Sequence, residues 1–306
     1  MELIRQLEKK YLVYAITGNR ETGMVIPYKR EVDKEKRVPW GIDTTMGAAL
    51  LSCDRMTKDT LDYIAKMPDS LVVSFEGMSP IYLQHKMPLT TEKIEELKRI
   101  GCKDILTAHT HESHNNTYGD FHLMNPGSVG LPDNGIQGAS YGVLTWRNQH
   151  WRMERQHISY DYEKQKKLIR ESSTLMEHCK HWGYALIAAI DTGINVPALY
   201  MFEVKQIAKE YAENKDKEKS FQHDISLGIG RYGNINPYRN YLEDRIIIGD
   251  KIGALKFETD EFLPSSNFAI EDWMYDIALK NVLTSLYALK KEEKLESKVH
   301  RERKFM

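Results

Sequence analysis

The sequence has few cysteines, no excess of charge of either sign and no long apolar run. Its three cysteines, Cys53, Cys102 and Cys179, are widely separated and do not form a disulfide framework, which is typical of a reducing cytoplasm. The 43 Lys and Arg residues against 44 Asp and Glu residues give a net charge of -1, which argues against bulk electrostatic binding of nucleic acid. No apolar run reaches the ~18 residues that cross a bilayer. The first ten residues predict an amphipathic helix rather than a targeting signal. These absences predict a cytoplasmic protein that does not enter membranes.

What is present is enough apolar sequence for a core and two different patterns along 306 residues. Residues 1–160 alternate between strand and helix patterns, whereas residues 161–306 are mainly helical. We therefore predict two domains that meet near residue 160. In the first, we expect strands at 11–17, 71–75, 81–85, 104–111, 121–125, 139–146 and 150–158, with helices at 2–9, 58–66 and 91–100. In the second, we expect helices at 161–178, 183–191 and 196–213 and from about residue 268.

His109 and His111 are the most informative residue pair. They lie two positions apart at the end of the predicted strand 104–111, where extended backbone would place both side chains on one side. Two imidazoles at a strand end are suited to metal binding. The alternative is a pair of surface histidines beside a polar loop. The nearby Asn125–Pro132 run, NPGSVGLP, favours the metal site because it predicts a conformationally special turn shortly after the histidines.

These segments resemble the calcineurin-like metallophosphoesterase family, in its small bacterial phosphodiesterase branch. That branch carries Gly-His-Thr-His at a strand end, then Asn-Pro-Gly-Ser-Val-Gly-Leu-Pro and an Ala-Ser-Tyr strand. Here Ala108 replaces the first glycine, and the remaining positions match through Ala139-Ser140-Tyr141. Upstream, Gly18-Asn19-Arg20-Glu21 resembles the family's Gly-Asn-X-Asp/Glu block, and His85 resembles its single histidine after a strand. Four blocks in family order make the resemblance specific over about residues 1–165.

The resemblance implies an α/β (α+β) fold, a two-sheet sandwich flanked by helices, followed by a helical C-terminal region. It also implies that Asn19, His85 and His109 bind one metal ion of a pair and that His111 binds the other. Imidazole nitrogens and an amide oxygen suit Mn, Fe, Ni or Zn. Two such ions would activate a water to hydrolyse a small phosphoester, most consistently a diester. Taken without the resemblance, Asn19 is more typical of a turn-capping residue and His85 of a core histidine.

Supporting roles follow for the neighbouring residues. Arg20 stands where some family members have a histidine, and its guanidinium would either contact phosphate oxygens or point to solvent. Glu21 would support the turn, and Gly127 and Ser128 would shape the turn beneath the ligands.

The family's first two blocks, Asp-X-His and Gly-Asp, have no counterpart before Asn19. They supply the carboxylate that bridges both metals, so the expectation is a domain without its first β-α-β unit and a site with two, one or no ions. Missing strands would leave an open sheet edge and exposed apolar surface, which favours pairing with another chain, including a second copy. The competing hypotheses are a catalytically inactive interaction module and an incomplete gene product that folds poorly.

Three other motifs favour ordinary structure. Residues 244–253 resemble an apolar strand ending in Gly249-Asp250, but a match to the family would need a permuted chain order, and a turn is the simpler interpretation. The GxGxxG at 228–233 is not followed directly by a predicted helix, so we expect a loop rather than a dinucleotide site. His178, Cys179 and His181 cluster on a predicted helix, where His178 and His181 would share one side and could bind a metal ion. A solvated helix face is the favoured interpretation.

Overall fold

The structure is a computed structural model that describes residues 1–25, 45–86, 89–213, 273–284 and 286. The chain forms two compact units. The sandwich unit comprises Met1–Trp40, Gly47–Asp133 and Gly138–Tyr160. The helical unit comprises Gly41–Met46, Asn134–Gln137 and Asp161–Met306. The predicted segments 228–233 and 244–253 lie outside the described residues. In the part of the chain that is described, no helix is long and apolar enough to cross a membrane.

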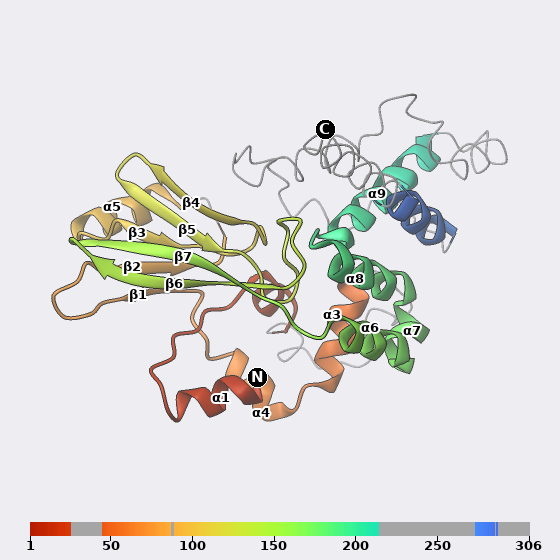
Figure 1. Ribbon diagram of the computed structural model, residues 1–306, viewed down its shortest axis with the longest axis horizontal. Coiled ribbons are helices and arrows are strands. Elements are labelled where there is room, and N and C mark those ends of the chain that lie inside the picture. The colour runs from red at the N-terminus through yellow and green to blue at the C-terminus, as the bar shows by residue number, and fades with distance from the viewer. Residues whose placement is uncertain (26–44, 87–88, 214–272, 285, 287–306) are drawn as a thin grey trace, which may run out of the picture. The chain divides into compact units, whose positions relative to one another are not determined.

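A five-stranded mixed sheet organises the sandwich unit (Figure 1). The strand order is β1-β2-β3-β5-β4, in which β2, β3 and β5 run parallel and the two outer strands run antiparallel to their neighbours. Because β2 and β3 are parallel neighbours, their carboxyl ends lie at the same edge of the sheet. The strands are β1 (Ser70–Val73), β2 (Ile81–Gln84), β3 (Asp104–Leu106), β4 (Ser113–Tyr118) and β5 (Phe121–Pro126).

One face of this sheet packs against helix α5 (Thr91–Arg99). The Thr90 hydroxyl accepts the Lys93 amide and caps the helix start, and Gly101 follows its end with φ +69°. The helix contributes fully buried Leu97 to this side of the core. Burial raises the pKa of the neighbouring Cys102 thiol to about 11, so the thiol is protonated at neutral pH. The core of this layer consists of Tyr82, Leu97, Cys102, Ile105 and Leu123.

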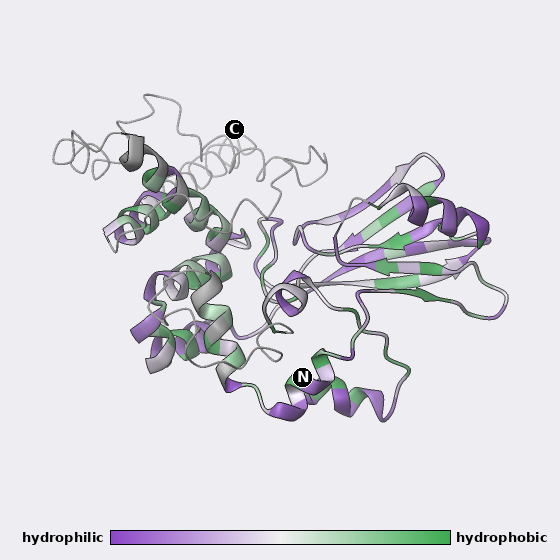
Figure 2. Ribbon diagram, turned by 180° about the vertical axis from the view of Figure 1, so that it is seen from behind, coloured by the Kyte–Doolittle hydropathy of each residue, from purple (hydrophilic) through white to green (hydrophobic). Residues whose placement is uncertain are grey.

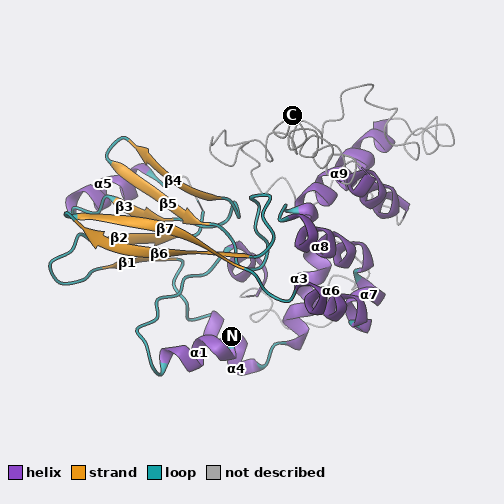
Figure 3. Ribbon diagram, in the orientation of Figure 1, coloured by secondary structure: helices purple, strands orange, loops and turns teal. Residues whose placement is uncertain are grey.

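The other face is covered by a hairpin of β6 (Ala139–Arg147) and β7 (His150–Ile158) (Figure 3). Side chains alternate along each strand, so Ile81 and Met124 point toward the hairpin and contact the layer containing Trp151 and Met153. Figure 2 shows apolar residues gathered along the middle of the strands, between the polar loops. The predicted two-sheet sandwich flanked by helices is confirmed.

The N-terminal segment differs from its prediction. Helix α1 (Glu2–Glu8) forms, but residues 11–17 form no strand. Among the described residues, this segment makes two backbone hydrogen bonds to other residues, from the Tyr11 amide to the Leu7 carbonyl (2.8 Å) at the end of α1 and from the Thr17 amide to the Pro68 carbonyl (2.9 Å). Leu12 is 74% exposed. The apolar sequence therefore indicated a strand, but the segment lacks the row of backbone partners that makes one.

Three short helical elements follow this segment and, apart from residues 45–46, they lie in the sandwich unit. A π-helical turn, η1 (Glu21–Val25), comes first, and α3 (Thr45–Arg55) and α4 (Lys58–Ile64) come later in the chain. Val25, Cys53 and Ile64 pack together as their small common core.

The helical unit contains α6 (Tyr162–Glu171), α7 (Ser173–His178), α8 (Lys180–Thr192) and α9 (Val196–Glu213), together with a helix over 273–284. The expected solvated face at His178, Cys179 and His181 is wrong for two of these residues. Cys179 is fully buried where α7 ends and α8 begins. His181 is buried with its ring stacked near Tyr200, and its Nε2 lies 2.6 Å from Asp276 Oδ1. A break in the helix turns both side chains inward.

Candidate metal centre

Three predicted ligands meet at the carboxyl ends of β2 and β3. His85 directly follows β2, and His109 lies three residues beyond β3. The His109 Nδ1 atom lies 3.1 Å from His85 Nε2, and Asn19 Oδ1 lies 3.0 Å from the same nitrogen. The two rings meet edge to face with centroids 5.0 Å apart. The parallel pairing of β2 and β3 therefore brings residues 24 positions apart to one point.

The distances of Asn19 Oδ1 and His109 Nδ1 from His85 Nε2 fit a shared metal ion. Two ligands that are each ~2.1 Å from an ion and at right angles lie about 3.0 Å apart. Across the described residues, no group of three or more His, Cys, Asp and Glu side chains is placed to hold a metal ion. The third donor of this site is instead the amide of Asn19. Its chemistry, two imidazoles and one amide oxygen, suits a transition metal.

His111 lies beside this trio and is oriented separately. Its Nδ1 donates to the Leu131 carbonyl at 2.7 Å, which leaves Nε2 as the nitrogen with an available lone pair. A backbone carbonyl on one imidazole nitrogen is the usual way in which proteins orient a metal-binding histidine. The positive charge that His111 can carry also lowers the pKa of His85.

The backbone of both histidines is left-handed, which contradicts the extended geometry that we expected. The φ angles are +72° at His109 and +63° at His111, and β3 ends at Leu106. The Ala108 amide donates to the His85 carbonyl (3.1 Å), which starts the turn before the histidines. The two rings therefore reach one region through a tight turn rather than through strand alternation.

Asn125 holds this turn and was missed as a functional residue by the sequence reasoning. Its fully buried Nδ2 donates to the Ala108 carbonyl (2.8 Å), and its Oδ1 accepts the Gly127 amide (2.9 Å). The sequence signal for this role was the Asn-Pro-Gly run, because a buried asparagine before a sharp turn can hydrogen-bond to the backbone of two loops. The turn itself needs Gly127, which has φ +89° and would place a Cβ 3.1 Å from Ser140 Cβ. Ser128 closes it by accepting the Leu131 amide (3.0 Å).

The Gly18–Glu21 turn approaches His85 from the other side. Glu21 Oε2 accepts the Gly18 amide (2.8 Å), and a Cβ at Gly18 would lie 3.1 Å from His85 Cε1. Burial lowers the pKa of His85, and nearby Glu21 opposes this shift, so the neutral imidazole that metals bind is favoured. Burial also lowers the pKa of the half-buried Arg20 guanidinium, again opposed by Glu21. Arg20 nevertheless keeps its charge at neutral pH.

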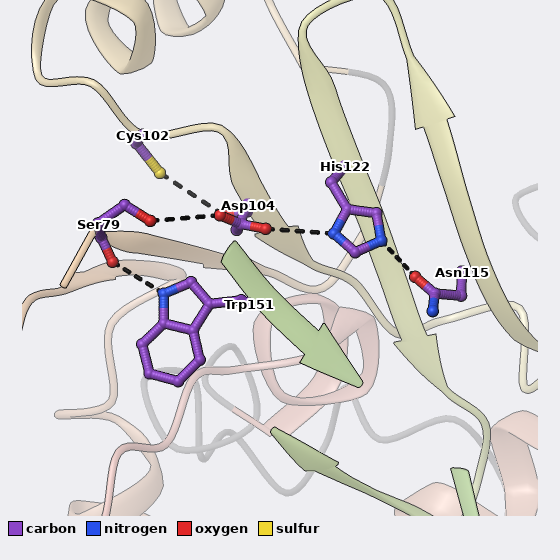
Figure 4. Close-up of polar contacts among 6 residues, drawn as sticks. All are labelled: Ser79, Cys102, Asp104, Asn115, His122 and Trp151. Atoms are coloured by element: carbon purple, nitrogen blue, oxygen red, sulfur yellow. Dashed lines mark hydrogen bonds and ion pairs between the residues drawn. The ribbon is translucent and has the colours of Figure 1, made fainter. Parts of the chain in front are cut away.

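A second polar group, which we call the Asp104 cluster, lies at the opposite ends of the strands (Figure 4). The buried Asp104 carboxylate accepts from the Ser79 hydroxyl (3.4 Å) and contacts His122 Nδ1 (3.2 Å). The other ring nitrogen of His122 contacts the Asn115 side-chain oxygen, and the Trp151 indole donates to the Ser79 carbonyl (2.9 Å). These contacts join strands of both layers. The cluster therefore stabilises the sandwich and is separate from the ligand trio.

Comparison with known proteins agrees with the fold. Residues 1–149 match the model of the calcineurin-like phosphoesterase superfamily domain. Over these residues the chain is similar to the calcineurin-like phosphoesterase superfamily, whose members are typically metal-dependent phosphoesterases.

Solved structures with related folds have low identity to this chain. A hypothetical protein from Pyrococcus horikoshii OT3 is 17% identical, with a TM-score of 0.44 over 63% of this chain and 77% of its own. A metallophosphoesterase from Sphaerobacter thermophilus is 15% identical, with a TM-score of 0.41 over 63% of this chain and 81% of its own. Vps29 from Entamoeba histolytica, solved with Zn²⁺, is 16% identical, with a TM-score of 0.22 over 30% and 62%. The curated proteins contain no match to the sequence.

Proposed function

We propose that the protein hydrolyses a small phosphodiester with the help of divalent metal ions and that residues 1–160 form the catalytic domain. The observation that carries this proposal is the convergence of Asn19 Oδ1 and His109 Nδ1 on His85 Nε2, each within 3.1 Å of that nitrogen. These three residues would hold one ion of Mn, Fe, Ni or Zn, and His111 would contribute to a second. When bound, such ions lower the pKa of a coordinated water so that it can attack phosphorus.

The chain's own residues would orient the reaction. Glu21 and Gly18 fix the turn that presents Asn19, and Asn125 fixes the turn that presents His109. Arg20 is half-buried in the same Asn19–Glu21 turn, and its planar guanidinium would hold two non-bridging oxygens of the phosphate. A diester carries one negative charge, which a single arginine can match.

The test is Mn²⁺-dependent hydrolysis of bis(p-nitrophenyl) phosphate by the purified chain, together with metal binding by calorimetry. His85→Ala and His109→Ala should each reduce kcat/KM by at least the ~10–100-fold that loss of a residue supporting a metal site costs. His150→Ala is the control, because His150 is an exposed histidine at the β6–β7 turn. Metal binding without turnover would favour the competing hypothesis of an inactive interaction module. No metal binding in the wild-type chain would refute the proposal.

A further inference from the structure

Two hydrogen bonds connect the side chain of Ser128, in the Asn125–Pro132 run, to the ring of His111. The Ser128 hydroxyl accepts the Leu131 amide at 3.0 Å. The Leu131 carbonyl in turn accepts the hydrogen of His111 Nδ1 at 2.7 Å. All of these residues belong to the sandwich unit. The position of the His111 ring can therefore depend on a side chain that does not touch it.

Leu131 transmits an orientation because Pro132 follows it. A residue that precedes proline is restricted to extended backbone, so the amide and the carbonyl of Leu131 have a narrow range of relative directions. Pro132 and Asp133 are both buried, and the Asp133 amide donates to the His111 carbonyl at 3.2 Å, which fixes the far end of the same segment. When Ser128 holds the Leu131 amide, the direction of the Leu131 carbonyl is therefore held as well.

The backbone of Ser128 is anchored separately from its hydroxyl. Its carbonyl accepts the amide of Ser140, at the start of β6, at 3.0 Å. Ser140 is buried, and a Cβ on Gly127 would lie 3.1 Å from Ser140 Cβ, so the turn packs closely against this strand. Ser128→Ala therefore removes the contact to Leu131 and leaves the anchor of the turn in place.

The ring of His111 requires such support. Its φ of +63° is a conformation that non-glycine residues adopt only when their surroundings impose it. A hydrogen bond from Nδ1 also selects the tautomer that leaves a lone pair on Nε2. We propose that Ser128, acting through Leu131, is a positioning residue that fixes the orientation and the tautomer of His111. The metal half of this inference rests on the proposed function, because it takes His111 Nε2 as a ligand.

The first readout is the tautomer of His111 in the metal-free protein. At pH 8.5 imidazoles are neutral, and two-bond ¹H–¹⁵N spectra show which ring nitrogen carries the proton. The signal of His111, assigned by its loss in His111→Gln, should be that of the Nδ1–H form in the wild type. Ser128→Ala should change it to a mixture of both tautomers and should accelerate hydrogen exchange at the Leu131 amide by about 10-fold.

Two variants serve as controls. Ser172→Ala removes a hydroxyl that accepts the Leu175 amide at 3.3 Å, the same serine-to-leucine bond at the start of α7, and should leave the His111 tautomer unchanged. Ser128→Thr keeps a hydroxyl and should restore the wild-type signal. Faster exchange at Leu131 with an unchanged tautomer would overturn the proposal. If Ser128→Ala does not fold, Ser128→Cys keeps the size of the side chain, weakens the acceptor and should show both changes to a smaller extent.

The second readout is Mn²⁺ binding by calorimetry. In Ser128→Ala the ion held by Asn19, His85 and His109 should keep its affinity. The ion bound through His111 should weaken by about 10-fold. Equal weakening of both ions, or no weakening, would contradict a positioning role. If the wild-type chain binds no ion, the proposed function fails, and the tautomer alone decides whether Ser128 positions His111.

Discussion

The left-handed backbone of His109 and His111 makes the ligand turn the most strained part of the described site. A left-handed conformation costs an L-residue about 1–2 kcal/mol, and here two such residues occur within three positions. The surroundings that impose it are identifiable: Asn125 fixes Ala108, and Leu131 and Asp133 fix His111. These contacts keep both imidazoles directed toward the same region before any ion is bound.

Asp104 provides a test of a buried residue that is not part of the metal centre. Asp104→Ala leaves Ser79 and His122 without their shared acceptor and should lower the free energy of unfolding by about 1–3 kcal/mol. Urea denaturation followed by tryptophan fluorescence measures this loss, and Trp151, whose indole donates to the Ser79 carbonyl, contributes to the signal. Asp120→Ala, at the exposed β4–β5 turn, should change it by less than ~0.5 kcal/mol. Equal losses in the two variants would show that the Asp104 cluster does not stabilise the fold.

Among the secondary-structure elements, those with a local cause were predictable. The predicted helices at 58–66 and 91–100 correspond to α4 and α5, each of which begins at a threonine cap. The predicted strand pairs 71–75 and 81–85, and 139–146 and 150–158, form the hairpins β1–β2 and β6–β7. Elements that depend on distant partners were not. Residues 11–17 have a strand sequence but no ladder, and β4, with the polar sequence SHNNTY, forms because it pairs along its whole length with β5.

A leucine-to-alanine substitution, made once in α5 and once in the segment 11–17, distinguishes a packed element from an unpaired one. Leu97→Ala in α5 removes a fully buried side chain and should lower the free energy of unfolding by about 2–5 kcal/mol. Leu12→Ala, in the unpaired segment 11–17, should change it by less than ~0.5 kcal/mol, because the side chain is 74% exposed. Chemical denaturation measures both. A loss above 1 kcal/mol for Leu12→Ala would mean that this segment is packed in solution.

For the molecule as a whole, half-buried histidines should make the free energy of unfolding depend on pH. Burial lowers the pKa of His114 below its ordinary value of 6.5, so below that pH the unfolded chain binds more protons than the folded one. The free energy of unfolding should therefore fall as the pH decreases from about 7.5 through 6.5. His114→Gln should flatten this dependence in metal-free protein, measured as the urea midpoint at several pH values.

His150→Gln is the control for this experiment, because it removes an exposed histidine. It should leave the pH dependence as in the wild type, which also contains His85 with a lowered pKa. If His114→Gln kept the wild-type slope, proton uptake at His114 would not contribute to it.

The candidate site was partly predictable for the same reason as the fold. The identity of Asn19, His85, His109 and His111 followed from short motifs that could be compared with a family, and the structure brings three of them together. The support of His111 by Leu131 and Asp133, and the role of Asn125, required the tertiary arrangement, because these contacts join residues 15 or more positions apart. The spacing of residues along the sequence does not indicate which backbone carbonyl will accept a hydrogen bond from which histidine ring.

The β4–β5 hairpin connects His111 to Asn125 through a turn of two residues, Gly119 and Asp120. Its pairing matches Ser113 with Pro126 and Tyr118 with Phe121. A slip of one residue would turn Met124 away from the hairpin layer and Leu123 away from α5, and it would withdraw Asn125 from Ala108. Only one alignment of these two strands therefore satisfies the core and the ligand turn together. A chain that mispaired these two strands during folding would lose both its metal centre and its core packing. Such a misfolded molecule would therefore be neither stable nor partly active.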